Sequence, residues 1–362
     1  MRPPATPERT CPSCQKKLPI DAKICVDCGI YLKTGRSILT TQDESLNQIY
    51  VFAENTIRLI SWIIWAGIYP IASEAFGLRK PWVVRGIALV TVLVSLACLA
   101  AEWTDAPVWN SLKHLQLWTG DPAAGEQLLT QLDREMDLDG IEDPEVRAQA
   151  QQMARGMLEE HLASACEFHP IQLVTHAFLH GGILHLAGNM LFLMVLGARV
   201  NALIGNLWSL ILYPLLAVVA AISHMISVAG GPPIPMVGAS GAIMGLAGMY
   251  LVLFPRHPVH MAAWLRWGLI GGFHLSLRMF AVRGFWVVLF YIAFDVVYTV
   301  FGWEDTTAHW AHLGGFIGGA TIALILLITR RIDVRGGDLL SAILGRHAWK
   351  IIGRPGQRLA RA

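Results

Sequence analysis

The stretch MVGASGAIMGLAG (residues 236–248) determines the character of the chain. It begins an apolar run that continues to Phe254, with a single hydroxyl, that of Ser240, near its start. Glycines recur along it, so one face of the expected helix carries almost no side chain and another backbone can approach it closely. A second glycine-rich run, AHLGGFIGG (residues 311–319), contains His312 at its start. The two runs predict helices that pack against each other, one carrying a nucleophile and the other its base.

Composition and charge indicate a membrane protein. Of the 362 residues, 54% are hydrophobic and 15% are charged, whereas an average soluble domain has roughly 25% charged residues. The net charge of +2 gives no reason to expect a nucleic-acid partner. No apolar segment precedes residue 50, so we predict no signal peptide. The lipid bilayer is therefore the first expected partner.

Apolar runs of spanning length predict an all-α polytopic membrane protein with six transmembrane helices. The first begins at Pro81 and has Trp82 at the expected interface. A shorter run at 57–72 lies between charged residues, which favours an interfacial or packed helix over a seventh span. The expected spans are 81–101, 183–203, 207–228, 240–254, 284–301 and 311–328.

The distribution of charge predicts the orientation of these spans. Arginines gather in the 256–283 loop and in the tail, whereas the long 103–170 loop is acidic, with helical composition from residue 144. Basic segments remain in the cytoplasm, so six spans place both termini there, and we expect the inner membrane of a bacterial cell. The expected domains are a zinc ribbon (1–36), a linker with an interfacial helix (37–80), the membrane domain (81–330) and a basic cytoplasmic tail (331–362).

Residues 1–36 form a candidate zinc ribbon. Two CxxC pairs, Cys11 with Cys14 and Cys25 with Cys28, supply four thiolates with the spacing of a structural Zn²⁺ site. So short a segment needs the metal for its stability. Two disulfides, or unpaired thiols, are the alternative. Units of this kind more often bind a partner protein, or simply fold, than catalyse a reaction.

Polar side chains at the start of the second span form a third feature. His185 and Asn189 are four residues apart and share one helical face, and His180 precedes them. Polar groups that enter hydrocarbon are costly unless they have partners or a function. As hydrogen-bond donors at the depth of Ser240, they suggest an oxyanion hole.

These motifs resemble those of the rhomboid family of intramembrane serine proteases. The resemblance is carried by HAFLHGGILHLAGNMLF (176–192), GASG (238–241) and AHLGG (311–315), in the family's order, and covers roughly residues 80–330. It implies Ser240 as nucleophile and His312 as general base. It also implies that His185, Asn189 and the backbone N–H of Ser240 receive the oxyanion, with His180 as a structural partner and Gly238 and Gly241 flanking the nucleophile.

We therefore predict a Ser–His dyad that cleaves transmembrane segments of membrane-protein substrates through an acyl-enzyme, without a catalytic cofactor. A base must take the proton of Ser240, and packing alone would orient the ring of His312. Family members commonly carry an aromatic residue one turn after the nucleophile. Here that residue is Met244, whose thioether can pack on the imidazole. Asp295 lies inside the fifth span, where a carboxylate is a functional candidate, and it is expected to be protonated or paired. His176, His224 and His309 receive no role.

Other functions fit the sequence less well. A rhomboid-like protein that binds transmembrane clients without cleaving them would lack the serine or the histidine, and both are present. An α/β-hydrolase needs GxSxG after a strand, and residue 242 is alanine. The HExxH motif of zinc proteases is absent. A transporter would show internal repeats.

Overall fold

The computed structural model describes two compact units of the chain. The amino-terminal unit combines Met1–Ala72 with His260–Ala281, and the helical unit combines Ser73–Val259 with Val282–Ala362. The described residues are 8–10, 17–19, 38–62, 64–73, 79–104, 106–108, 112–121, 123–125, 127, 143–164, 168–232, 234–267, 274–301, 307–334 and 336–353.

The helical unit contains five helices that are long and apolar enough to cross a membrane. They confirm the prediction of a multi-pass, predominantly helical membrane protein. The fourth expected span is the apolar helix α10 (Ser240–Leu253), whose 14 residues fall short of the roughly 20 that a span needs. The total of six spans therefore stays a prediction. The five long helices are α2 (Trp82–Trp103), the continuous α7 (Ile183–Phe192), η3 (Leu193–Gly197) and α8 (Ala198–Ile204), α9 (Asn206–Ser227), α11 (Gly284–Phe301) and α12 (His309–Ile328).

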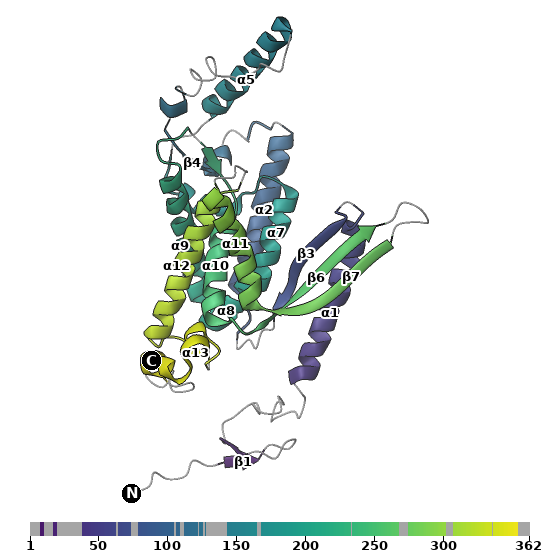
Figure 1. Cartoon of the computed structure of the whole chain (residues 1–362), viewed down its shortest axis with the longest axis vertical. Coiled ribbons are helices and arrows are strands. Elements are labelled where there is room, and N and C mark those ends of the chain that lie inside the picture. Colours follow the sequence, from purple (N-terminus) through teal and green to yellow (C-terminus); the bar gives the residue numbers. More distant parts are fainter. Residues whose placement is uncertain are drawn as a thin grey trace. The chain divides into compact units, whose positions relative to one another are not determined.

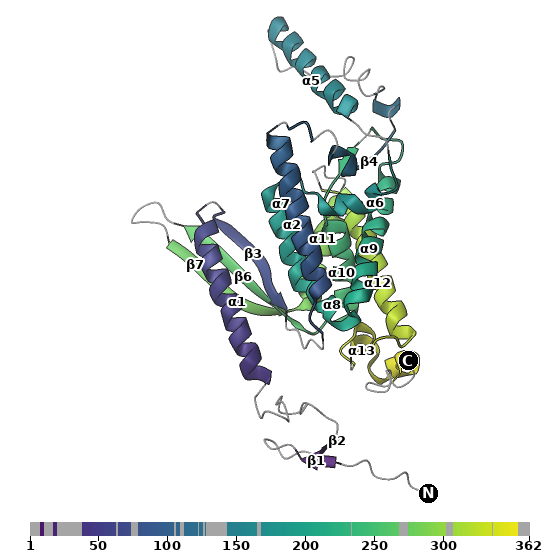
Figure 2. The same cartoon turned by 180° about the vertical axis from the view of Figure 1, so that it is seen from behind.

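Helix α10 lies inside the bundle and contacts α9, α11, α12 and η3 (Figures 1 and 2). Its crossing with α12 brings the two backbones together. A Cβ added to Gly315 would lie 2.1 Å from the carbonyl oxygen of Gly241, and one added to Gly319 would lie 1.8 Å from that of Gly245. No side chain larger than hydrogen fits there, so the structure confirms the glycine-lined contact predicted from the sequence.

Two asparagines near the α8–α9 turn accept hydrogen bonds from backbone N–H groups in the first turn of α2. That helix has no side-chain cap at its own N-cap residue. Oδ1 of Asn201 accepts from the N–H of Val84 at 3.2 Å, and Oδ1 of Asn206 accepts from that of Val83 at 3.3 Å. Nδ2 of Asn201 also donates to Oδ1 of Asn206 at 3.1 Å. These bonds supply partners for N–H groups that a helix start leaves unpaired.

The segments outside the spans carry further elements, most of them short. Strand β4 (Leu117–Thr119) pairs antiparallel with β5 (Ile234–Met236), which leads directly to Ser240. Helix α5 (Pro144–Ser164) confirms the helical composition expected in the 103–170 segment. The remaining short elements of this unit are η1 (Lys113–Leu115), α6 (Gln172–Thr175), η2 (His176–Phe178), α13 (Leu339–Leu344), η4 (Gly345–His347) and α14 (Ala348–Ile352).

In the amino-terminal unit, helix α1 (Ile38–Ile60) packs beside a three-stranded sheet of order β3-β6-β7 (Figure 2). The strands are β3 (Ala66–Ser73), β6 (Pro258–Trp267) and β7 (His274–Arg283). Ile57 of α1 and Ala262 and Trp264 of β6 form the buried core between them. The indole N–H of Trp264 donates to the carbonyl oxygen of Ile64 at 3.0 Å.

The sheet corrects the secondary structure expected for two segments. Residues 37–80 contain a helix and a strand in place of a linker followed by an interfacial helix, and the expected 256–283 loop contains β6 and β7. The alternation of Leu275, Leu277 and Met279 with more exposed neighbours was the local signal for β7. The partner of β6, however, lies some two hundred residues earlier, and strand stability depends on such contacts more than on local preference.

The candidate zinc ribbon lies mostly outside the described residues. Strands β1 (Glu8–Thr10) and β2 (Lys17–Pro19) pair antiparallel on either side of the first CxxC pair. All four cysteines, Cys11, Cys14, Cys25 and Cys28, fall outside the described part of the chain. The zinc site therefore stays a prediction.

The glycine contact predicts that Gly319→Ala destabilises the helical unit by at least about 2 kcal/mol, because α12 must move away from α10. Gly86→Ala is the matched control, since a Cβ there meets no atom within 4 Å. It should leave stability unchanged or raise it slightly through helix propensity. Thermal unfolding of both variants in one detergent measures the difference, and equal shifts would contradict the close crossing.

Candidate active site

The loop before α10 fixes the position of Ser240. Gly238 has a φ of +128°, a backbone conformation that residues with a side chain rarely adopt. Its N–H donates to the carbonyl oxygen of His176 at 3.0 Å, and the N–H of Ala239 donates to Nε2 of His180 at 3.5 Å. Ser240 is then the first residue of α10, where backbone N–H groups have no acceptor within the helix.

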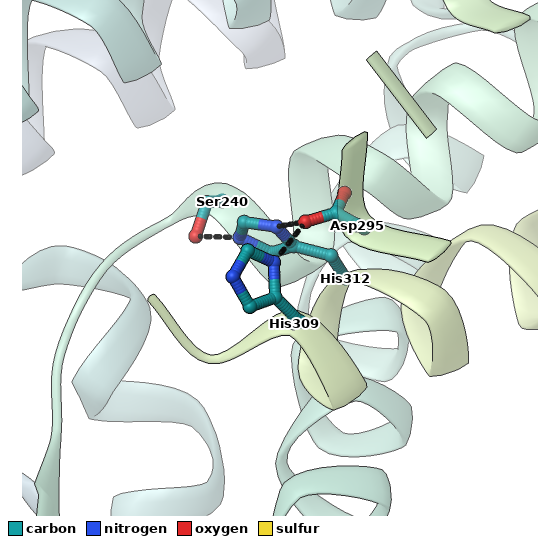
Figure 3. Close-up of polar contacts among 4 residues, drawn as sticks. All are labelled: Ser240, Asp295, His309 and His312. Atoms are coloured by element: carbon teal, nitrogen blue, oxygen red, sulfur yellow. Dashed lines mark hydrogen bonds and ion pairs between the residues drawn. The ribbon is translucent and has the colours of Figure 1, made fainter. Parts of the chain in front are cut away.

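His312 reaches Ser240 from the first turn of α12. Its Nε2 lies 2.8 Å from Oγ of Ser240, although the two residues are 72 positions apart. Its Nδ1 lies 2.8 Å from Oδ1 of Asp295 on α11. Figure 3 shows the imidazole between the hydroxyl and the carboxylate. The structure thus brings together the predicted serine and histidine and adds a carboxylate to them.

His309 completes this cluster of polar side chains. Its Nδ1 lies 2.7 Å from the same Oδ1 of Asp295 (Figure 3). Its ring stacks on Tyr298 of α11, with centroids 4.8 Å apart. The side chains of Asp295, His309 and His312 are 9%, 13% and 14% exposed. Such burial strengthens each hydrogen bond, because little water competes for the groups.

Asp295, His309 and His312 also offer ligand types that a metal ion accepts, within 4.8 Å of one another. Tetrahedral Zn²⁺ would hold adjacent ligand atoms about 3.4 Å apart, given its usual bond lengths. The two nitrogen–oxygen separations of 2.7 and 2.8 Å are those of direct hydrogen bonds instead. The described geometry is therefore that of a hydrogen-bonded cluster.

The expected oxyanion residues lie on α7, near the serine. A Cβ added to Gly238 would lie 3.0 Å from Cε1 of His185 and 3.6 Å from Oγ of Ser240, so both side chains border the same glycine. One turn beyond His185, Asn189 is buried, and its Nδ2 has no hydrogen-bond partner among the described residues. An unpaired buried donor is costly, and an oxyanion would supply the missing acceptor.

His180 supports the serine loop in its neutral form. Its Nδ1 lies 2.9 Å from Oγ of Ser95, whose hydroxyl donates to the carbonyl oxygen of Phe178 at 2.9 Å. Nδ1 therefore carries the proton, and Nε2 is free to accept from Ala239. Burial, assisted by the nearby His185, lowers the pKa of His180 to about 3. Burial likewise lowers the pKa of His176 to about 4.

The remaining predicted residues have different surroundings. A Cβ added to Gly241 would lie 2.5 Å from that of Ala220 on α9, so Gly241 serves helix packing directly behind the serine. Met244 is partly buried one turn after Ser240. Its packing on the imidazole stays a prediction.

The sequence does not predict the place of two members of this cluster, Asp295 and His309, beside Ser240 and His312. As a carboxylate inside a span, Asp295 is a functional candidate that is expected to be protonated or paired, and His309 receives no role. The sequence does contain an indication for His309: it lies three residues before His312, so the two share a helical face. A carboxylate inside a span needs a partner, but the sequence does not reveal that α11 faces this turn of α12.

Comparison with known proteins supports the resemblance drawn from the motifs. Residues 167–329 match the family model described as the Rhomboid domain. The matched segment runs from α6 to the end of α12 and contains Ser240, Asp295 and His312. No curated protein matches the chain. The match supports the rhomboid family, whose members are usually intramembrane serine proteases.

The neutral state of His180 predicts a pH-dependent stability. Its pKa in the folded protein lies below the value near 6.5 of an unfolded chain, so the unfolded chain binds the proton first as pH falls. Stability is therefore lost below pH 6.5, by about 2 kcal/mol at pH 5 for this residue alone. In His180→Gln, whose amide can keep the bond to Ala239, the loss between pH 7 and pH 5 should be smaller by that amount.

Unfolding in detergent at the two pH values measures this difference. His347→Gln, at an exposed position of η4, is the matched control and should retain the acid sensitivity of the wild type. Equal pH sensitivity of His180→Gln and wild type would contradict the assignment.

Proposed function

We propose that the chain is an intramembrane serine endopeptidase with Ser240 as nucleophile and His312 as general base. The 2.8 Å contact between Oγ of Ser240 and Nε2 of His312 carries this proposal. Ser240 is the first residue of the apolar helix α10. Side chains of α7, α11 and α12 surround its hydroxyl. A hydroxyl within hydrogen-bonding reach of an imidazole is the arrangement that nucleophilic catalysis requires.

In the proposed reaction, Nε2 of His312 takes the proton of Ser240 while Oγ attacks a peptide carbonyl of the substrate. The carbonyl electron pair moves to oxygen, which becomes the oxyanion. Collapse of this intermediate breaks the C–N bond, and the imidazolium gives its proton to the leaving nitrogen. Water then hydrolyses the acyl-enzyme with His312 again as base. No cofactor is needed for these steps.

The oxyanion would be received by Asn189, His185 and the backbone N–H of Ser240. The unpaired Nδ2 of Asn189 supports this assignment, since preorganised donors in a site of low dielectric stabilise charge that develops there. Because His185 borders Gly238 beside the serine, its ring can add a second side-chain donor.

Transmembrane segments of membrane proteins are the proposed substrates, since the serine lies on an apolar helix of a multi-pass protein. A helical segment must unwind locally before attack, because its carbonyls are otherwise hydrogen-bonded. The proposal includes a bacterial inner membrane with both termini cytoplasmic. It also includes a structural Zn²⁺ on Cys11, Cys14, Cys25 and Cys28, on a unit that could bind a partner protein.

Removal of either catalytic group should abolish proteolysis. We expect wild type in liposomes to cleave a single-span test substrate, and Ser240→Ala and His312→Ala to be slower by at least about 10³-fold. A fluorophosphonate should label wild type and not Ser240→Ala. A folded wild type that captures the substrate but neither cleaves it nor reacts with the probe would favour the alternative, a non-catalytic binder of transmembrane clients.

Loss of the side-chain amide of Asn189 should lower kcat by about 10²-fold, the usual effect of removing one oxyanion donor. Stability should not fall, because Nδ2 leaves no described partner behind. Asn189→Ala is compared with Asn201→Ala, whose side chain caps α2 instead. The control should lose stability and keep its kcat, whereas an unchanged kcat in Asn189→Ala would remove this residue from the oxyanion site.

A further inference from the structure

Asp295 is a buried carboxylate on an apolar helix, where an unpaired charge would be strongly unfavourable. Its Oδ1 lies 2.8 Å from Nδ1 of His312 and 2.7 Å from Nδ1 of His309. Both nitrogens belong to the first turn of α12, where the helix dipole also favours negative charge. The carboxylate thus meets two imidazoles at the end of α12 that carries the proposed base.

We infer that Asp295 is a positioning residue that fixes the tautomer and the orientation of His312, so that a Ser–His–Asp triad replaces the dyad expected from the sequence. This inference rests on the proposed function and deepens it. A carboxylate oxygen accepts hydrogen bonds and has no proton to donate. Nδ1 of His312 therefore carries the hydrogen, and Nε2 is left to accept the proton of Ser240.

The chain of bonds has one consistent direction. The hydroxyl of Ser240 donates to Nε2 of His312, and Nδ1–H of His312 donates to Oδ1 of Asp295. When Nε2 takes the proton, the ring becomes an imidazolium whose Nδ1–H already points at a carboxylate. The bond to Asp295 then strengthens as charge develops, which is the role of the third member of a triad.

His309 holds the carboxylate in this position. Its Nδ1–H supplies a second donor to the same oxygen, and its ring stacks on Tyr298, three residues after Asp295 on α11. Rotation of the carboxylate away from His312 would break both bonds. His309 thereby links α11 to α12 and holds His312 through Asp295, while its ring also lies edge to face against that of His312, with centroids 6.2 Å apart.

Substitution of the carboxylate by an amide tests the triad. In Asp295→Asn, the amide NH₂ can donate to Nδ1 and leave the proton on Nε2, so His312 no longer accepts from Ser240. We expect kcat for a single-span substrate to fall about 10²–10⁴-fold, with KM changed less than about threefold. Thr299→Val, one turn further along α11, is the matched control and should keep kcat within about twofold. A folded Asp295→Asn with the kcat of the control would overturn the inference.

The tautomer of His312 supplies a readout that a merely structural role would not move. In protein with ¹⁵N-labelled histidine, assigned by comparison with His312→Ala, we expect Nδ1 to be protonated in wild type and Nε2 in Asp295→Asn. The same tautomer in both proteins would overturn the inference. Because this measurement needs no substrate, it decides the role of Asp295 even if wild type proves not to be a protease.

Two further variants allow the inference to be tested even if Asp295→Asn does not fold. Asp295→Glu keeps an acceptor and should retain the wild-type tautomer with a kcat at least about tenfold above that of Asp295→Asn. His309→Phe keeps a ring for Tyr298 but removes one donor, and should lower kcat by about tenfold. If Asp295→Asn does not fold, a folded Asp295→Glu in which Nε2 of His312 carries the proton would overturn the inference.

Discussion

The approach of α10 to α12, backbone against backbone, is the constraint on which the proposed site depends. Each helix contributes glycines where the other passes, and a single methyl group at Gly315 or Gly319 would occupy the place of a carbonyl oxygen. Because packed helix axes usually lie about 8–10 Å apart, only such small residues allow the first turns to come close. A serine side chain, which is short, can then reach the ring of His312 directly.

This packing also determines where polar groups are tolerated. The hydroxyl, the two imidazoles and the carboxylate of the cluster each have at least one hydrogen-bond partner within it, so their burial among apolar helices is compatible with a stable fold. Asn189 differs from these groups, because its Nδ2 is buried without a hydrogen-bond partner among the described residues. A donor kept unpaired in the resting protein is free to bind charge that forms only during a reaction, whereas a donor already engaged would first have to break a bond.

Patterns in the sequence predicted the parts of the structure that depend on local composition. The apolar runs, the glycine-lined face and the four-residue spacing of His185 and Asn189 follow from helix geometry. The sheet of the amino-terminal unit could not be predicted from the sequence, because its paired strands β3 and β6 are nearly two hundred residues apart in the chain. Asp295 could be identified as a residue in need of a partner, but not as the partner of His312, because that pairing depends on the rotation of α11 about its axis.

The proposed role of Asp295 also bears on a departure of this sequence from the family it resembles. Where rhomboid proteases commonly have an aromatic residue one turn after the nucleophile, this chain has Met244. A flexible thioether restrains a neighbouring ring less than a flat aromatic side chain does. A hydrogen bond to Nδ1 is directional and specifies the tautomer as well as the plane of the ring. In the proposed triad the bond to Asp295 orients the ring of His312, so packing of Met244 on that ring is not required for this purpose.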